Sequence, residues 1–362
     1  RLGLSLLEGD EKPAEVASMQ YFLAFTLYYA NKNYDAAAVA DFIVRTANKE
    51  QAVQAQDAAY LALGALSRIY HEKDPNSRDA ERELMANAAS LLVKRWPESK
   101  RADDARLILG DVYQSAGKPQ EAITYFKSVT KTHPRHQEAL LKAGQQSWVL
   151  YLDELQKPEA ERVDTAELDA ASKQAENLIK QGLVLVEKNV SSKGVPPNVY
   201  ILAKVSLVEI YNSQEKEAEA LKLFKDAPFG LEALFSNNKN AAPDSVTKNR
   251  AVGIQAFQLL LRTHMGLGNI DEAIKTMDKL KAVAGSDNPE QLTQIYVQLG
   301  VKLREEIDRL KAAGNQERLD TVTSAFDRFL QALTDQQSGL DYSTLFWVAE
   351  SYANLGEGVQ AD

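Results

Sequence analysis

The chain has 362 residues, of which 44% are hydrophobic, so it is long enough to bury an extensive core. Its net charge of −9 and its pI near 5.2 exclude the basic stripe that nucleic-acid binding requires and disfavour adsorption to anionic membranes. No apolar run approaches the roughly 20 residues of a membrane-spanning helix, so we predict no direct membrane insertion, and the lack of cysteine excludes disulfides and thiolate chemistry.

Helical periodicity is nearly continuous along the chain, and no convincing alternating strand pattern exceeds about four residues. One helix pair is predicted over residues 14–48, with its turn at 31–33. A second pair begins near Gln56 and carries an insertion at 72–77 between its helices. The third pair, over 103–134, shows the clearest pattern and provides the template for the others.

The template is a spacing of small and aromatic residues. It consists of Leu109-Gly110 and Tyr113 on the first helix, then Ala122 and Phe126 on the second, then Pro134. A small residue fits where two helices approach closely, and an aromatic ring fills the gap between successive helices. The spacing recurs at Tyr211, Ala220 and Phe224, at His264, Ala273 and Met277, and more weakly at Leu27, Ala36 and Ala40. The pattern predicts repeated antiparallel helix pairs.

Lys157-Pro158 interrupts the helical pattern and divides the chain into two predicted arrays, residues 1–157 and 158–362. The second array contains an irregular stretch at 226–247, which is long for a connection between repeats. We expect its apolar side chains to fix packing rather than to act as a lid. The chain opens without Met and stops soon after the first helix of a further unit, so we expect both ends to be truncation or processing boundaries. In total, about eight helix pairs are predicted, some of them degenerate.

No residue constellation predicts catalysis, and we predict no cofactor. The stretch from Gly110 to Lys118 resembles a phosphate loop only superficially, because Pro119 stands where serine or threonine is required. This stretch also falls across a predicted helix and its turn, so a structural role explains it better. The chain is therefore predicted not to be an enzyme.

The histidines and clustered carboxylates also have structural explanations. His133 and His136 flank a proline, but no third ligand is evident nearby, so we predict no metal site. His264 takes the place of Tyr113 in its repeat and is expected in the core. Carboxylate pairs such as Asp103-Asp104 lie among basic residues at helical spacing and are interpreted as solvated helix faces.

These motifs resemble the tetratricopeptide repeat family, specifically over 103–134 and more loosely over most of the chain. The resemblance implies an all-α, right-handed solenoid with a concave groove, lined by the first helix of each pair, that holds a peptide or a partner helix. The run from Trp96 to Ala105 is similar to repeats of bacterial periplasmic and outer-membrane-associated proteins. We therefore expect an exported, periplasmic bacterial protein, with the cytoplasm as the alternative.

The resemblance carries the family's groove positions onto three repeats. The predicted partner-binding residues are Tyr21, Phe25 and Tyr28 in the first unit, Leu61 and Arg68 in the second, and Leu107, Asp111 and Gln114 in the third. In the unit around Tyr211 the corresponding positions are Val205, Glu209 and Asn212. Some family members clamp an acidic C-terminal tail with basic residues. Because acidic residues stand here in their place, such a clamp is disfavoured.

The aromatic residues of the first unit form the sharpest of these predictions. Tyr21, Phe25 and Tyr28 are four and three residues apart, so they lie on one helix face. Such a face suits an apolar, extended or helical peptide. The alternative is that preceding residues of the full-length protein cover these side chains.

The sequence thus predicts a non-enzymatic scaffold for a protein or peptide partner. One alternative is a structural segment of a larger exported protein whose groove packs against its own missing regions. A second alternative is a regulatory repeat segment of an enzyme whose catalytic motifs lie outside residues 1–362. The sequence identifies neither the partner nor the oligomeric state.

Overall fold

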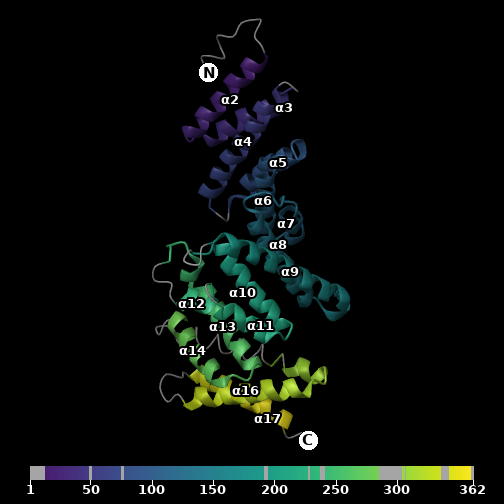
Figure 1. The fold of residues 1–362 in the computed structure, drawn as a ribbon, viewed down its shortest axis with the longest axis vertical. Coiled ribbons are helices and arrows are strands. Elements are labelled where there is room, and N and C mark those ends of the chain that lie inside the picture. The colour runs from purple at the N-terminus through teal and green to yellow at the C-terminus, as the bar shows by residue number, and fades with distance from the viewer. Residues whose placement is uncertain are drawn as a thin grey trace. The chain divides into compact units, whose positions relative to one another are not determined.

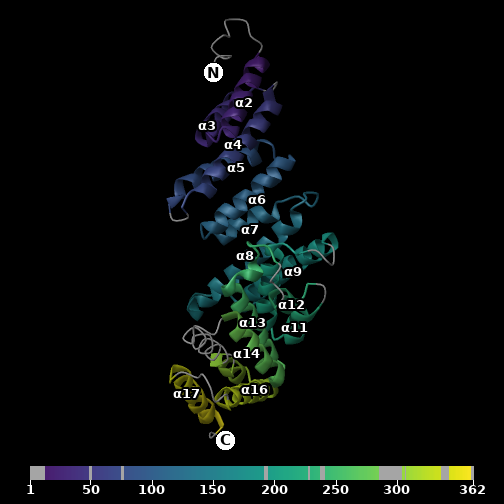
Figure 2. The ribbon, with the colours of Figure 1, turned by 90° about the vertical axis from the view of Figure 1, so that its left-hand side faces the viewer.

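Helices account for all the regular secondary structure that is described (Figures 1 and 2). The computed structural model describes residues 13–48, 51–74, 77–190, 195–226, 229–236, 241–284, 304–305, 307–335 and 342–359. Over this part of the chain the predicted all-α architecture of repeated helix pairs is confirmed. The right-handed sense of the solenoid stays a prediction. The expected helix start at Asn288-Pro289 and the expected Leu299-Gly300 signature lie outside the described residues.

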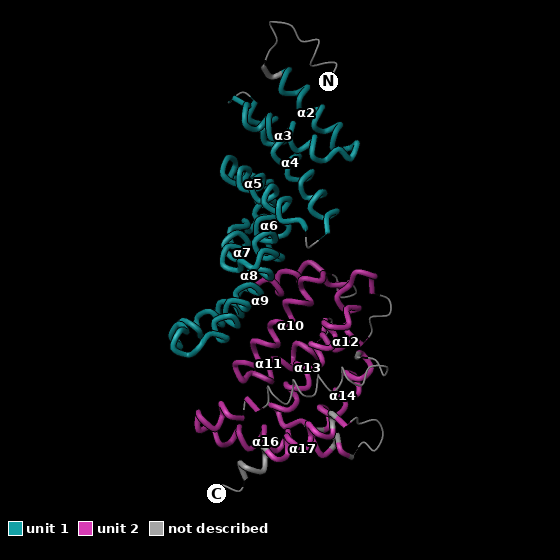
Figure 3. The backbone as a smooth tube through the Cα atoms, turned by 180° about the vertical axis from the view of Figure 1, so that it is seen from behind, with its two compact units in different colours: residues 1–178 teal, residues 179–362 magenta. Residues whose placement is uncertain are grey.

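Two compact units divide the chain, residues 1–178 and 179–362 (Figure 3). The first contains α2 (Pro13–Tyr29), α3 (Asn33–Thr46), α4 (Ala52–Glu72), α5 (Asp79–Arg95), α6 (Lys100–Ser115), α7 (Pro119–Lys127), α8 (His136–Gln156), the 3-10 turn η3 (Glu159–Glu161) and the first part of α9 (Thr165–Asn189). From α2 to α8, each helix packs on the next. The units meet within α9, whereas the predicted division of the repeat arrays at Lys157-Pro158 stays a prediction.

The second unit continues the alternation of longer and shorter helices. It contains the end of α9, α10 (Asn198–Ser213), α11 (Glu217–Lys225), α12 (Leu231–Ser236), the 3-10 turn η5 (Val246–Lys248), α13 (Arg250–Gly266), α14 (Ile270–Ala284), α16 (Gln316–Asp335) and α17 (Tyr342–Val359). Here α10 packs on α11, α13 on α14, and α16 on α17.

One turn geometry recurs between paired helices and explains the spacing seen in the sequence. In each turn a backbone N–H donates to the carbonyl five residues earlier. The residue immediately before the donor has a positive φ. The donor and acceptor pairs are Lys32 and Leu27, Lys118 and Tyr113, Lys216 and Tyr211, Asn269 and His264, and Asn315 and Leu310, at 2.8–3.1 Å. The positive-φ residues are Asn31, Gly117, Glu215, Gly268 and Gly314. In the last turn the acceptor is Leu310 rather than an aromatic residue, and the sequence pattern did not identify this turn.

The small residues predicted at close helix contacts behave differently in two repeats. A Cβ atom added to Gly110 would lie 2.3 Å from the ring of Phe126, so only glycine allows α6 and α7 to approach this closely. At Gly64 the nearest atom to an added Cβ is the Tyr28 hydroxyl at 3.7 Å, an ordinary contact. The predicted close approach is therefore confirmed at Gly110, whereas Gly64, the glycine at the corresponding position of α4, leaves room for a side chain.

Within the described part of the stretch 226–247, the backbone is more regular than the sequence predicted. It contains α12 and the start of η5, because Leu231 and Phe235 are buried on one side of a short helix and nucleate it against the unit's core. Phe235 meets Phe257 of α13 edge-on, with ring centroids 6.4 Å apart. Glu232 lies between two lysines, with its carboxylate 2.7 Å from Lys225 and also bonded to Lys279. These contacts confirm a packing role for the apolar side chains.

The two glycines give a matched test of close packing. Gly110→Ala should lower the free energy of unfolding by about 1–3 kcal/mol, because the new methyl group overlaps the Phe126 ring. Gly64→Ala should instead raise it by about 0.5–1 kcal/mol, because alanine is the better helix former and meets no obstacle. Urea unfolding of both variants beside the parent measures the difference. Equal effects at the two positions would contradict the packing difference.

Candidate functional site

Polar and aromatic contacts link the first helices of successive pairs in the first unit, namely α2, α4, α6 and α8. Arg68 of α4 contacts Tyr28 of α2, and Arg101 of α6 pairs with Asp57 of α4. Lys142 of α8 in turn pairs with a carboxylate of α6, Asp111. These helices therefore present one connected surface, which we call the first-helix face.

An aromatic ridge lies on α2 at one end of this face. It consists of Tyr21, Phe22, Phe25, Tyr28 and Tyr29, whose neighbouring ring centroids are 4.6–6.3 Å apart. Phe22 and Tyr29 are 65% and 67% exposed, and Phe25 is 39% exposed. Tyr21 and Tyr28 share the buried side of α2 with Ala17 and Ala24, at steps of three and four residues, and are partly buried against the core. Phe22, Phe25 and Tyr29 are the members of the ridge that face outward.

Phe22 and Tyr29 were missed in the sequence analysis, although they are the most exposed members of the ridge. They are seven residues apart, so they share one stripe of α2 beside the predicted Tyr21, Phe25 and Tyr28. The signal that could have found them is composition: α2 carries aromatic residues over more of its circumference than packing against α3 and α4 can cover.

The structure brings two of the predicted residues, Tyr28 and Arg68, together. The guanidinium carbon lies 3.6 Å from the centre of the Tyr28 ring, and one of its nitrogens donates a 3.2 Å hydrogen bond to the Tyr28 carbonyl. Arg68 thereby satisfies a carbonyl of the last turn of α2 and fixes the tyrosine ring. Leu61, on the same helix, is partly buried against the core.

The predicted residues of α6 divide between core and surface. Leu107 is fully buried beside Phe126 and Val129, so its prediction as a groove residue is wrong. It was misplaced because its helix turns a different side toward α7 and α8 than the family's spacing implied. Asp111 lies at the surface, 2.7 Å from Lys142, and Gln114 is exposed.

The corresponding positions of the second unit are corrected in the same way. Val205 and Asn212 are buried, and the Asn212 amide donates to the Leu259 carbonyl while its oxygen accepts from the Thr263 hydroxyl. They join α10 to α13 and are unavailable to a partner. Glu209 is the acidic residue among these positions, and it is not buried. In this unit it is therefore the one position that still argues against a tail clamp.

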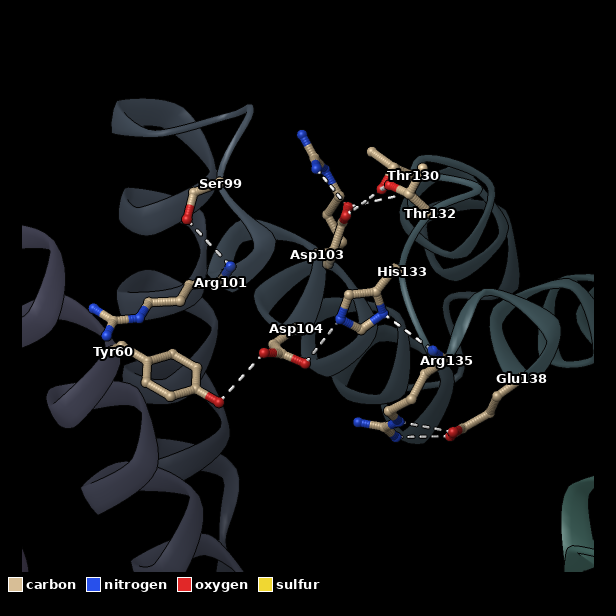
Figure 4. A network of polar contacts seen from close by, with 11 residues as sticks. Tyr60, Ser99, Arg101, Asp103, Asp104, Thr130, Thr132, His133, Arg135 and Glu138 are labelled. Atoms are coloured by element: carbon tan, nitrogen blue, oxygen red, sulfur yellow. Dashed lines mark hydrogen bonds and ion pairs between the residues drawn. The ribbon is translucent and has the colours of Figure 1, made fainter.

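A chain of polar contacts crosses from α4 to the start of α8 (Figure 4). The Tyr60 hydroxyl donates to Asp104 at 3.3 Å, and the other oxygen of Asp104 lies 3.3 Å from Nε2 of the buried His133. Nδ1 of His133 accepts from the backbone N–H of Arg135, which places the proton of a neutral ring on Nε2, toward Asp104. The network holds successive first helices in register.

Asp103 shows that one predicted solvated carboxylate is structural. It is 3% exposed, and it accepts hydrogen bonds from the backbone and hydroxyl of Thr130 at 3.1 and 2.5 Å and from Arg106 at 2.7 Å. Burial raises the pKa of Asp103, but these bonds outweigh burial and lower it. The interpretation of Asp103 as part of a solvated face is wrong, because its bonds tie α6 to the segment after α7.

The histidines have separate partners. His136 contacts the Val129 carbonyl through Nδ1 at 3.1 Å, whereas His133 faces Asp104. Among the described residues no group of three or more histidine and carboxylate side chains is arranged to hold a metal ion. His264 is 2% exposed, which confirms its predicted place in the core, and burial lowers its pKa.

The middle of the first unit is similar to a known protein family. A family model described as tetratricopeptide repeat matches residues 104–136, which hold most of α6, all of α7 and the first residue of α8. No curated protein sequence matches the chain. The match and the helical fold support a tetratricopeptide repeat protein, a class that typically mediates protein–protein interactions without catalysis. Within the part of the chain that is described, each helix is too short or too polar to cross a bilayer.

Glu138 makes the first-helix face sensitive to acid. Both of its oxygens accept from Arg135 at 2.8 Å, and Lys142 lies 2.9 Å away. Burial raises the pKa of Glu138, but the bonds from Arg135 and Lys142 outweigh burial and lower the pKa from 4.5 to about 2. A lowered pKa means that folding favours the ionised form. The contribution of the Glu138 carboxylate to the free energy of unfolding is therefore complete well above pH 4.5 and is lost as the pH falls toward 2.

Glu138→Gln should reduce the free energy of unfolding by about 1 kcal/mol at neutral pH, once the partial exposure of the carboxylate is allowed for. The difference from the parent should shrink as the pH falls through and below 4.5, because the parent's own carboxylate then becomes protonated on unfolding. Urea unfolding at a series of pH values measures it. Glu83→Gln, at an exposed position of α5, is the control and should show little difference at any pH. A Glu138→Gln difference that persists undiminished in acid would contradict the assignment.

Proposed function

We propose that this protein is a non-enzymatic interaction scaffold that holds a peptide or partner helix on its first-helix face. The observation that carries the proposal is the aromatic ridge of α2, in which Phe22, Phe25 and Tyr29 are exposed beside the partly buried Tyr21 and Tyr28. Monomeric proteins rarely leave such an apolar patch open without a binding role. Aromatic residues and arginine are also the side chains that most often dominate binding free energy at interfaces.

The ridge is pre-organised for binding. Contacts between neighbouring rings and the cation–π contact of Arg68 restrict the side chains before a partner arrives. Less conformational entropy is then lost on association. Away from the ridge, the charges of Asp111 and Glu138 are already paired with Lys142. These pairs add selectivity around an apolar contact rather than a strong charge attraction.

Composition supports the proposed class of partner, and composition together with a sequence similarity supports the proposed location. The net charge of −9 disfavours nucleic acid and anionic lipid, which leaves a protein or peptide as the occupant. We extend the proposal to an exported, periplasmic protein of a bacterium. It is supported by the similarity of residues 96–105 to repeats of such proteins and by the absence of cysteine from the sequence.

A crosslinked pull-down from the native cell extract tests the first-helix face. The variant Tyr21→Ala with Phe25→Ala removes two neighbouring rings but keeps Tyr28, because Tyr28 orders Arg68 and the end of α2. A partner enriched by the parent should be lost by about tenfold or more from this variant, in keeping with loss of aromatic anchors. Circular dichroism checks that the variant stays helical.

The matched control lies in the second unit. Tyr342 and Phe346 are also four residues apart and exposed, with ring centroids at 6.4 Å against 6.3 Å for Tyr21 and Phe25. Tyr342→Ala with Phe346→Ala should leave the partner profile unchanged. Identical profiles for the parent and the Tyr21/Phe25 variant would overturn the proposal and favour coverage of the ridge by other parts of the full-length protein.

A further inference from the structure

A groove separates the second helices of the first two pairs, α3 and α5. It encloses about 590 Å³, with α4 forming its floor through Ala62 and Leu66. We call it the α3/α5 groove. Its walls carry apolar side chains that are open to solvent: Tyr34 is 51% exposed and Leu84 is 46% exposed. These helices do not contribute to the aromatic ridge, so the groove is a different surface from the first-helix face.

The groove is held open by polar ties at both ends. The Tyr34 hydroxyl donates to Glu81 at 2.7 Å, which joins the first turns of α3 and α5. Arg95 donates to the Val44 carbonyl, which joins their last turns. Because corresponding ends are joined, the two helices run in the same direction. Between the ties, alanines such as Ala38 and Ala88 are too small to fill the space.

The walls have the periodicity of a helix-binding surface. On α3 the lining residues include Tyr34, Ala38, Asp41 and Arg45, and on α5 they include Leu84, Ala88, Leu91 and Lys94. Each set follows the steps of three and four residues that form a straight stripe along a helix. The stripe from Tyr34 to Arg45 is about 16 Å long, or about three helical turns. A third helix fits lengthwise between two such stripes, with apolar side chains seated over the alanines.

Charge selects the orientation of that helix. Among the described residues no carboxylate is paired with Lys94, which lies in the last turn of α5, at the end of the groove where α3 and α5 both terminate. Arg45, in the last turn of α3, is already paired with Asp41 of the same groove. Two helix C-termini at one end favour a third helix that runs the opposite way, with the positive end of its dipole beside them. The first turn of that helix then meets Lys94. Acidic residues in a first turn stabilise their own helix and would pair with this lysine.

We propose that the α3/α5 groove binds an amphipathic helix of a partner protein, antiparallel to α3 and α5, with carboxylates in its first turn and an apolar stripe of about three turns. This inference rests on the proposed scaffold function, because it adds a second docking surface for a protein partner. It does not depend on the aromatic ridge.

The probe is a stapled helical peptide with leucine and alanine at the i, i+3, i+4 and i+7 positions, glutamates in its first turn and a fluorophore at its far end. Fluorescence anisotropy measures its affinity for the full chain. The parent should bind it, and a peptide with lysines in place of the glutamates should bind several-fold more weakly. Lys94→Glu should reverse this preference, whereas Lys127→Glu, a charge reversal in the last turn of α7, should not.

The second part of the experiment fills the groove with a large side chain. Ala38 is exposed, so Ala38→Trp occupies the space without removing a core contact, and it should weaken peptide binding by about tenfold or more, as expected for a steric block. Ala251→Trp, at an exposed position of α13, is the control and should bind as the parent does. Tyr21→Ala with Phe25→Ala should also bind the probe as the parent does, which separates this inference from the proposed function.

Three results would overturn the inference: no peptide binding by the parent, binding that Ala38→Trp leaves unchanged, or binding lost only in the Tyr21/Phe25 variant. A further arm replaces the peptide with dodecanoate, a small apolar anion. Dodecanoate binding that Ala38→Trp abolishes, with no peptide binding, would assign the groove to small amphiphiles and also overturn the proposal.

Discussion

Close approach of neighbouring helices is the constraint on which the rest of this structure depends. It is made possible by buried small residues, among them Ala36, Ala40, Ala58, Ala62, Ala89, Ala105, Gly110, Ala122, Ala220 and Ala273. A larger side chain at these points would separate the helices and disturb every contact that spans them. The Gly110–Phe126 contact shows the limit, because even one added methyl group would overlap the ring. Spacing between helices therefore sets which surface side chains can meet.

Both candidate surfaces follow from this packing. On the first helices, short separations let Arg68 cover Tyr28 and let Lys142 reach Asp111, so the face is pre-organised. On the second helices, small residues such as Ala38 and Ala88 leave a gap between the two ties that Tyr34 and Arg95 make across it. One constraint thus produces a filled face on one set of helices and an open groove on the other.

Buried polar groups give the repeats their individual registers. Asp103, His133 and Asn212 each bond to a segment of another helix or turn, and each would carry an unsatisfied polar group if that segment moved. Apolar packing alone tolerates sliding between similar helices, whereas these bonds have one satisfied geometry. Glu232, clasped between Lys225 and Lys279, places the additional helix α12 within the second unit in the same manner.

The amino-acid sequence by itself determined the helix pairs, their turns and the core position of His264, because these depend on spacings of three to five residues that local backbone geometry dictates. It also placed Tyr21, Phe25 and Tyr28 on one face. Only the tertiary structure decided that Leu107 and Asp103 are buried, that Phe22 and Tyr29 complete the ridge, and that a groove lies between α3 and α5. Those outcomes depend on which neighbouring helix covers a given side, and that is a matter of contacts between residues far apart in the chain.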